Sequence, residues 1–408
     1  SYLKTYTNHR IIYVPNMAWQ AFALAGAMRS VGLDARVMPE PDAESLSLGR
    51  KYTTGKECYP ALLTAGDMLR HIRGPEFDRE RTAFFMGAAD GPCRFGQYNS
   101  LHRLILDELG YHDVPLYVID QDEEFTRDLQ VAGGASFERR AWAGICAVDA
   151  LEQLLLRARP YELNPGETNE WMDRSVNAVA DAIAAGAALD AVLKQARSEL
   201  DAIPTAGRNG RPRIGVVGEI YVRSNRFAND NLLEMIERLG GEAMMPTMAE
   251  WLHYSRSMRK RRKKSRRDLG GLLGDVLRSK YQYASERRIY TALGMAPDPP
   301  VETLLELSRP YIDSSFEGEA ILALGKSIEM IRDHGVCGIV NTMPFTCMPG
   351  TITSILLRRM RDDYNGVPVL NMSYQGQQNL NNRIRLEAFV YQARQYMEER
   401  QTAATGVS

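Results

Sequence analysis

The chain has 408 residues, and its 50 basic and 51 acidic side chains leave a formal net charge of −1. The 44% hydrophobic and 25% charged residues are ordinary for a globular protein and exclude disordered, collagenous and coiled-coil chains. No apolar run approaches the roughly 18 residues that span a bilayer, and Ser1–Arg10 lacks the apolar core of a signal peptide. We therefore expect a cytoplasmic protein of two or three domains that does not associate with membranes.

Short apolar segments alternate with amphipathic ones in the first third of the chain. The pattern predicts strands at 11–15, 35–38, 82–86 and 114–119, and helices at 17–31, 60–72 and 95–109. Strands that alternate with helices of this length form a parallel sheet with helices on its faces. We expect an N-terminal α/β domain over residues 1–135.

A helical section and a second α/β domain follow, at 136–211 and 212–408. Helices are predicted at 140–159 and 169–203, before a linker rich in Gly, Asn, Arg and Pro at 204–212. Strands are then predicted at 214–217, 242–245, 338–341 and 367–372, and helices at 231–239, 249–293 (a long insertion), 318–333, 351–361 and 382–400, before a loose tail at 402–408. The predicted fold class is α/β, with two Rossmann-like parallel-sheet domains and an intervening helical section. No repeat of constant period is visible, although the two α/β halves are of similar build.

Three of the five cysteines are predicted to lie at helix N-termini. Cys58 directly precedes a helix whose first turn contains Pro60, a residue favoured there because it lacks an amide donor. Cys93 lies in a Gly- and Pro-containing loop between a buried strand and a helix, and Cys347 lies in a similar loop after the strand at 338–341. Loops at the carboxyl ends of parallel strands converge, and helix N-termini lower thiol pKa values. This placement favours a metal site made of three thiolates.

The cysteines also admit other interpretations. A single cysteine of this kind is more often a buried core residue, and Cys146 and Cys337, in apolar segments, are predicted to be core. Tetrahedral zinc would need a fourth ligand, and close Cys-x-x-Cys pairs are absent, so zinc is the weaker choice. An iron–sulfur cubane with three cysteines leaves one iron for substrate, water or a bridging sulfide.

Around these cysteines the chain resembles the activase-related relatives of the 2-hydroxyacyl-CoA dehydratases, a family that includes the double-cubane cluster proteins. The motifs that carry the resemblance are Gly32–Leu33 with 39–48, Gly49–Cys58, Gly91–Tyr98, Gly218–Arg223 with Asn225, and Pro344–Gly350. The chain departs from the family at Tyr374–Gly376, where an acidic residue is expected after the tyrosine. Much of the family occurs as the terminal module of longer activases, and the abrupt start at Ser1 suits a processed or truncated chain.

The resemblance implies an oxygen-sensitive iron–sulfur protein in which Cys58, Cys93 and Cys347 are the cluster ligands. It also implies a homodimer or a related subunit, and a separate ATP-hydrolysing iron–sulfur activase as electron donor. The chain has no Gly-x-x-x-x-Gly-Lys-Ser/Thr loop, so the ATP step is expected on that partner. The cofactor is either one 4Fe–4S cluster or an 8Fe–9S double cubane shared between chains, because six cysteines would be needed and the chain has five.

The expected function is an iron–sulfur reductase component that reduces or eliminates a small-molecule substrate. The alternatives are a 2-hydroxyacyl-CoA dehydratase subunit and a non-enzymatic electron-transfer module. Glu219 and Arg223 follow the strand at 214–217 and are candidate catalytic residues, which would position substrate or donate protons. The alternative is that Glu219 caps a loop and Arg223 pairs with a carboxylate.

The remaining charged motifs carry less information. The basic run at 256–267 suits a solvated helix face or a docking surface for an acidic electron donor better than a nucleic-acid site, since no aromatic residues interleave with it. Glu317 and Glu319 precede a helix, where capping alone explains them. His102 is predicted to be a surface or core residue and not a ligand.

Overall fold

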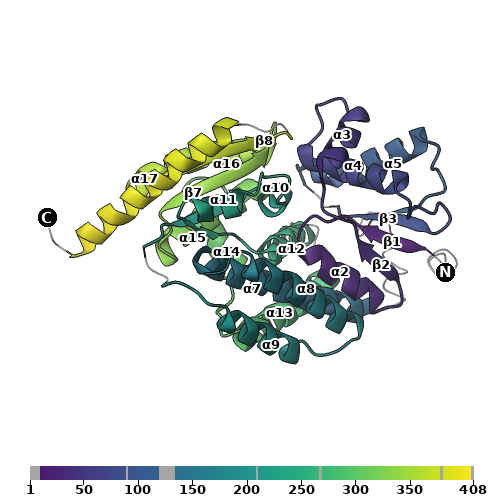
Figure 1. Ribbon diagram of the computed structural model, residues 1–408, viewed down its shortest axis with the longest axis horizontal. Helices are drawn as coiled ribbons and strands as arrows, with labels where there is room; N and C mark the ends of the chain where they lie inside the picture. The colour runs from purple at the N-terminus through teal and green to yellow at the C-terminus, as the bar shows by residue number, and fades with distance from the viewer. Residues whose placement is uncertain are drawn as a thin grey trace. The chain divides into compact units, whose positions relative to one another are not determined.

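The fold is taken from a computed structural model, in which the described residues are 10–88, 91–118, 134–207, 210–265, 269–376 and 380–405. It contains two four-stranded sheets in which all strands are parallel, so the predicted α/β class is confirmed (Figure 1). The chain divides into two compact units. The first comprises Ser1–Leu151, Asp173–Arg197 and Val276–Pro297, and the second comprises Glu152–Met172, Ser198–Asp275 and Asp298–Ser408.

The sheet of the first unit has the strand order β2-β1-β3-β4. Its strands are β1 (Ile11–Val14), β2 (Asp34–Val37), β3 (Thr82–Met86) and β4 (Leu116–Val118). Its helical elements are α2 (Gln20–Arg29), α3 (Ala43–Lys51), α4 (Tyr59–Arg73), the 3-10 helix η2 (Arg94–Gln97) and α5 (Tyr98–Glu108). Every residue of β3 is buried, because helices cover both faces of a parallel sheet. The segment predicted as one helix at 95–109 is the 3-10 helix η2 followed by the α-helix α5. Residue 119 of the predicted fourth strand lies outside the described residues.

The sheet of the second unit has the order β6-β5-β7-β8. Its strands are β5 (Arg213–Gly218), β6 (Glu242–Met244), β7 (Gly338–Pro344) and β8 (Val369–Tyr374). The helices that follow β5 are α10 (Ile220–Ser224), α11 (Leu232–Arg238), α12 (Met248–Ser265), α13 (Leu269–Ala292), α14 (Val301–Ser308), α15 (Glu319–Asp333), α16 (Met348–Asp363) and α17 (Leu380–Thr405). The insertion predicted as one helical segment at 249–293 consists of two helices, α12 and α13. The tail predicted to be loose is helical as far as Thr405, and residues 406–408 lie outside the described part.

The helical section contains α7 (Gly134–Ala158), the 3-10 helix η3 (Arg159–Tyr161), α8 (Glu167–Ala184) and α9 (Asp190–Ala202). Residues of this section belong to both units. A linker follows α9 as predicted in sequence, although residues 208–209 within it lie outside the described residues. No helix among the described residues is both long and apolar enough to cross a membrane.

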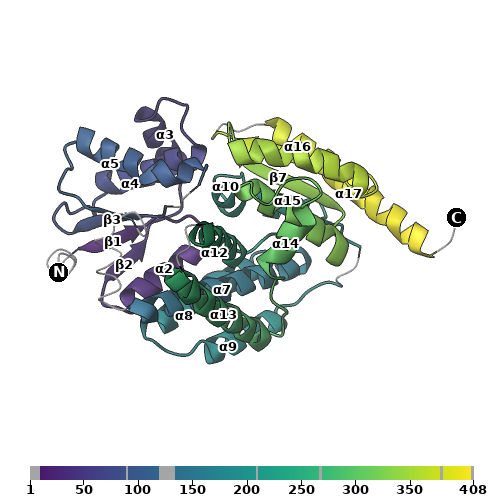
Figure 2. The same ribbon diagram turned by 180° about the vertical axis from the view of Figure 1, so that it is seen from behind.

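In each unit a pair of closely packed helices leads into the third strand. The pairs are α3 with α4, and α14 with α15 (Figure 1 and Figure 2). Glycine permits both contacts: a Cβ atom at Gly66 would lie 1.8 Å from the carbonyl oxygen of Ser45, and one at Gly325 would lie 2.1 Å from that of Leu304. The two units therefore share both their strand order and this close backbone packing.

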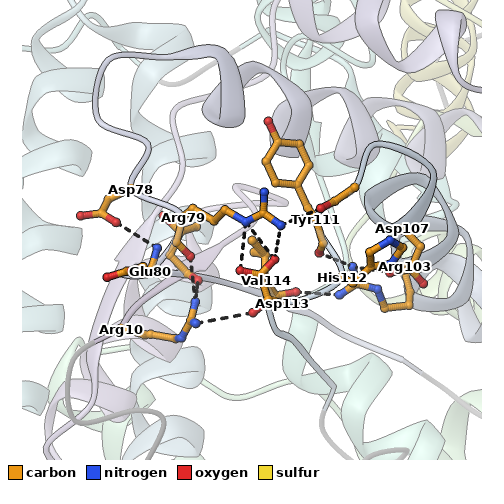
Figure 3. A network of polar contacts seen from close by, with 12 residues as sticks. Arg10, Asp78, Arg79, Glu80, Arg103, Asp107, Tyr111, His112, Asp113 and Val114 are labelled. Atoms are coloured by element: carbon orange, nitrogen blue, oxygen red, sulfur yellow. Dashed lines mark hydrogen bonds and ion pairs between the residues drawn. The ribbon is translucent and has the colours of Figure 1, made fainter.

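A network of polar contacts ties down the amino ends of the strands in the first sheet (Figure 3). Arg10 donates through Nη1 to the carbonyl oxygen of Thr82 at 2.7 Å, and Arg103 donates to that of Val114 at 2.6 Å. Arg79 donates through Nε to Asp113 at 2.9 Å. These residues fasten the turn that enters β4. They lie at the amino ends of the strands, whereas Cys58 and Cys93 lie beside the carboxyl ends. The network therefore stabilises the first sheet and is not part of the candidate site.

Candidate functional site

The structure places Cys58, Cys93 and Cys347 in one backbone conformation. Each is an N-cap residue, of α4, η2 and α16 respectively. Their φ and ψ angles are −65° and 135°, −75° and 137°, and −69° and 117°. The placement at helix N-termini expected from the sequence is therefore observed at all three positions. In this conformation a side chain can accept from amides that the helix leaves without an internal acceptor. Cys93 and Cys347 do so, and Cys58 makes no such cap hydrogen bond.

Two of these sulfur atoms accept backbone hydrogen bonds. Cys93 Sγ accepts the N–H of Phe95 at 3.5 Å, and Cys347 Sγ accepts the N–H of Gly350 at 3.4 Å. Gly350 must be glycine for this approach, because a Cβ atom there would lie 2.7 Å from the Cβ of Met343. Amide donors and the positive end of the helix dipole favour thiolate over thiol. These sulfurs are thus prepared for negative charge.

The first unit joins the loops of two of the cysteines. Cys58 is 6% exposed and packs with Met86, at the carboxyl end of β3, and with Tyr98 of α5. Arg94, next to the half-buried Cys93, donates through Nη1 to the carbonyl oxygen of Lys56 at 2.8 Å. The two loops thus meet at one edge of the first sheet, as expected for segments beside the carboxyl ends of parallel strands.

Cys347 belongs to the second unit, so a site of three thiolates would draw on both units. Among the residues that the structure describes, no three His, Cys, Asp or Glu side chains are grouped so as to hold a metal ion. The ligand set implied by the resemblance therefore stays a prediction.

The other two cysteines and His102 have the surroundings of core residues. Cys146 and Cys337 are 0% and 5% exposed, and burial raises the pKa of both thiols. His102 is buried against Thr64 and the carbonyl oxygen of Ala61, and burial lowers its pKa to about 4. The imidazole is therefore neutral at physiological pH. These surroundings agree with the core roles predicted for Cys146 and Cys337, and of the two places predicted for His102, surface or core, the structure shows the core.

Glu219 lies at the carboxyl end of β5 and is the N-cap of the short helix α10. Its carboxylate accepts the N–H of Tyr221 at 3.2 Å and the N–H of Val222 at 2.8 Å. Gly218, directly before it, has a φ of 110°, and a Cβ atom there would lie 2.0 Å from the carbonyl oxygen of Thr342 on β7. Only glycine fits this close approach of two strands. The capping role weighed for Glu219 is therefore real, and it fixes the carboxylate at the strand end.

Arg223 is 4% exposed, and among the described residues it forms no ion pair within 4.0 Å, so the carboxylate partner weighed for it is not observed at contact distance. Its Nη2 donates to the carbonyl oxygens of Pro246 at 3.2 Å and Thr247 at 3.5 Å. The guanidinium still lowers the pKa of Glu219, against the stronger effect of burial, which raises it. Arg223 thus supplies positive charge to the strand end.

Glu319 is the first residue of α15, and the N-cap of that helix is Gly318. Burial and the negative charge of Glu219 together raise the pKa of Glu319 to about 8, against the opposing effect of Arg223. The capping explanation given for Glu319 from the sequence does not include the effect of Glu219, because the two residues are distant along the chain.

A second buried charge cluster surrounds Lys326 of α15. Its Nζ lies 3.3 Å from Glu250, 2.9 Å from Asp298 and 3.2 Å from Glu329. Lys326 and Asp298 line a cavity of about 350 Å³, together with His334. Burial raises the pKa of Glu250 to about 7. Sequence reasoning missed this cluster, although a lysine among the apolar residues of a predicted helix was a readable signal.

Part of the basic run at 256–267 makes contacts within its own unit. Arg262 pairs with Glu317 at 2.6 Å, and Arg261 donates to the carbonyl oxygen of Ser314. Arg259 and Lys264 are exposed on α12, while residues 266–267 lie outside the described part. The run is therefore partly a structural contact, and its role as a docking surface stays a prediction.

The comparisons with known proteins do not add an identity. No family model matches the chain, and no curated protein shows significant similarity to it.

Proposed function

We propose that this protein is a cytoplasmic iron–sulfur reductase component that receives low-potential electrons from an ATP-hydrolysing activase and reduces a small molecule. The observation that carries the proposal is the repeated N-cap conformation of Cys58, Cys93 and Cys347. Three thiols share this N-cap position, in two units whose sheets have the same strand order, and core packing alone does not require that repetition. The sequence resemblance to the activase-related family supports the same function.

The chemistry of the three donor side chains suits such a cofactor, although the described residues are not grouped as a metal site. Thiolates are the usual ligands of iron–sulfur clusters, and hydrogen bonds to sulfur are among the factors that set their reduction potential. Cys58, Cys93 and Cys347 would hold the cluster, as one 4Fe–4S unit per chain or as an 8Fe–9S double cubane shared by two chains. When bound, the group would supply one-electron transfer and an iron position open to substrate.

The protein's own residues would prepare and protect that site. The amides of Phe95 and Gly350 stabilise negative charge on two of the sulfurs. The apolar packing of Met86 and Tyr98 around Cys58 excludes water from the third. At the carboxyl edge of the second sheet, Glu219 supplies a carboxylate to position a substrate or exchange a proton with it.

The decisive experiment is anaerobic purification followed by measurement of iron, acid-labile sulfide and zinc per chain. We expect about four irons with matching sulfide, or about eight irons with nine sulfides per two chains. Cys58→Ser, Cys93→Ser and Cys347→Ser should each lose the iron, and Cys337→Ser, at a buried cysteine outside the set, should keep it. Stoichiometric zinc or the absence of iron would overturn the proposal.

Loaded protein with an activase and ATP should then consume a small oxidised substrate. Turnover of a 2-hydroxyacyl-CoA instead would assign the chain to the dehydratases. Electron uptake without consumption of any substrate would leave an electron-transfer module.

A further inference from the structure

The cavity of about 350 Å³ beside Lys326 lies within the second unit, and neither Cys347 nor Glu219 lines it. Its wall is made by residues of β6 and α15, by α7 residues within 153–157, by Arg213 at the start of β5 and by Asp298. This volume lies in the lower part of the range of cavities that hold small molecules. The cavity is therefore separate from the cysteines and large enough for a small ligand.

The buried end of this cavity holds more negative than positive charge. Lys326 Nζ, on a side chain that is 2% exposed, lies 2.9 Å from Asp298 and 3.2 Å from Glu329. It also lies 3.3 Å from Glu250. His334, 2.9 Å from Glu329, adds charge only when it is protonated. Even with a proton on Glu250, whose pKa burial raises to about 7, two carboxylates face one ammonium group. Because uncompensated buried charge is costly, this end favours a cation.

Two oxygen atoms around Lys326 make no hydrogen bond. The ammonium group donates to Asp298 Oδ1 at 2.9 Å. Glu250 Oε2 and Glu329 Oε2 are buried and make no hydrogen bond within the described part of the chain. Buried polar atoms of this kind are uncommon and call for a specific explanation. A second ammonium group at Asp298, which lines the cavity, would let Lys326 turn its N–H groups to these two oxygens.

The exposed end of the cavity has the opposite charge. Arg157 and Arg213 both line it. Arg213 Nε lies 3.3 Å from Glu242, which also accepts from the hydroxyl of Tyr161 at 2.7 Å. Arg157 is exposed and forms no ion pair with any described residue. Two guanidinium groups beside one carboxylate leave positive charge at this end, which therefore favours an anion.

Apolar side chains complete the wall. Leu156, Met244 and Met245 line the cavity together with the charged residues. Leu156 is 3% exposed and Met245 is 5% exposed. Ligand sites commonly combine an apolar wall with a few polar groups that fix the orientation of the ligand. A short carbon chain between two charged ends suits this wall.

We propose that this cavity binds a short ω-amino acid, with an ammonium group at one end of its carbon chain and a carboxylate at the other. The ammonium group faces Asp298, and the carboxylate faces Arg157 and Arg213. The ligand ammonium then takes the place at Asp298 of the N–H groups that Lys326 turns to its other two carboxylates. The site does not rest on the proposed reductase function, because none of the cysteines lines the cavity.

Isothermal titration calorimetry of the full-length chain tests the proposal with γ-aminobutyrate, δ-aminovalerate and ε-aminocaproate. Wild type should bind one equivalent of at least one of these per chain. It should bind the alkylamine and the carboxylic acid of the same chain length about tenfold more weakly, since each lacks one charged contact. If none of the three amino acids binds at millimolar concentration, or if the matching alkylamine binds equally well, the proposal is overturned.

Variants then test the orientation of the ligand. Arg157→Gln, at an exposed residue, should weaken binding of the amino acid about fivefold and leave the weaker binding of the alkylamine unchanged. Asp298→Asn should weaken both by about tenfold or more. Arg309→Gln, at an exposed arginine outside the cavity, is the control and should match wild type.

Unchanged binding of the amino acid in Arg157→Gln refutes the proposal, and so does equal weakening of both ligands in that variant. This arm decides the question even if Asp298→Asn fails to fold, which thermal unfolding would show. Binding is measured without any redox reaction, so a chain without iron would overturn the proposed function and leave this test intact.

Discussion

The helix pairs α3–α4 and α14–α15 occupy the same place in their sheets, yet they bury different chemistry. In α4, Asp67 accepts a hydrogen bond from Ser45 at 2.6 Å and lies 3.7 Å from Arg70. In α15, Lys326 lies among three carboxylates. Both pairs depend on a glycine at the contact, Gly66 in one and Gly325 in the other. The comparison shows that the two helix pairs share the close contact between their backbones, whereas the buried charged side chains near that contact differ.

The largest expected effect on stability is that of removing the buried charge of Lys326 in α15. Lys326→Met leaves three carboxylates without their cation, and we expect it to lower the free energy of unfolding by about 3–5 kcal/mol. Urea denaturation measures this change. Arg309→Met, at an exposed pair with Glu306, is the control and should cost under about 1 kcal/mol. Equal effects at the two positions would show that the cluster around Lys326 is not structural.

The next effect tests what the two pairs share. Gly66→Ala and Gly325→Ala place a Cβ atom against a backbone oxygen, which can yield only if the helices separate. We expect each to cost about 3 kcal/mol. Gly207→Ala, where nothing lies within 4 Å, should be close to neutral in the same thermal or urea unfolding series. A neutral Gly325→Ala beside a costly Gly66→Ala would break the equivalence of the two pairs.

The free energy of unfolding should depend on pH through Asp67, in the pair α3–α4. Burial raises the pKa of Asp67 from 3.8 to about 7. A raised pKa means that the folded chain holds the proton more tightly, so this contribution to stability is complete below about pH 4 and is lost as the pH rises through 7. The slope is at most about 1.4 kcal/mol per pH unit in that window. Asp67→Asn should flatten the unfolding free energy there, whereas Asp34→Asn, at an exposed position, should not.

The smallest expected effect concerns the surface of the second unit. The Arg262–Glu317 pair is partly exposed on both sides, so a double-mutant cycle with alanine should give a coupling of about 0.2–1 kcal/mol that shrinks in high salt. A coupling above this range would show that the end of α12 is held more firmly than an exposed ion pair allows.

Those strands and helices that have a clear apolar pattern could be predicted from the sequence. The eight strands were anticipated, because buried parallel strands are continuous apolar runs. The segments at 169–203 and 249–293 were each predicted as one helical stretch, whereas each contains two helices. Helix α3 was missed although Asp42 and Ser45 form a capping box at its start, since few of its residues are apolar. Helix α10 has only five residues, too few for a periodic pattern.

The site was predictable only where the information is local. The cysteines could be placed at helix N-termini because Gly and Pro residues punctuate the chain beside them. The approach of three carboxylates to Lys326 joins segments that are distant along the chain. Such approaches are set by how helices pack against the sheet, and no pattern within one segment encodes them.

The complete burial of β3 and β7 affects how fast their backbone amides exchange hydrogen with solvent. Each of these strands has a parallel neighbour on both sides, so its amides are bonded on both edges and shielded on both faces. Backbone groups of this kind exchange hydrogen with solvent only when the surrounding structure opens. Cys93 and Cys347 are the N-caps of the helical elements that come next in the chain after these two strands. We therefore expect the amides of β3 and β7 to exchange more slowly than those of the helical turns that hold the two thiols.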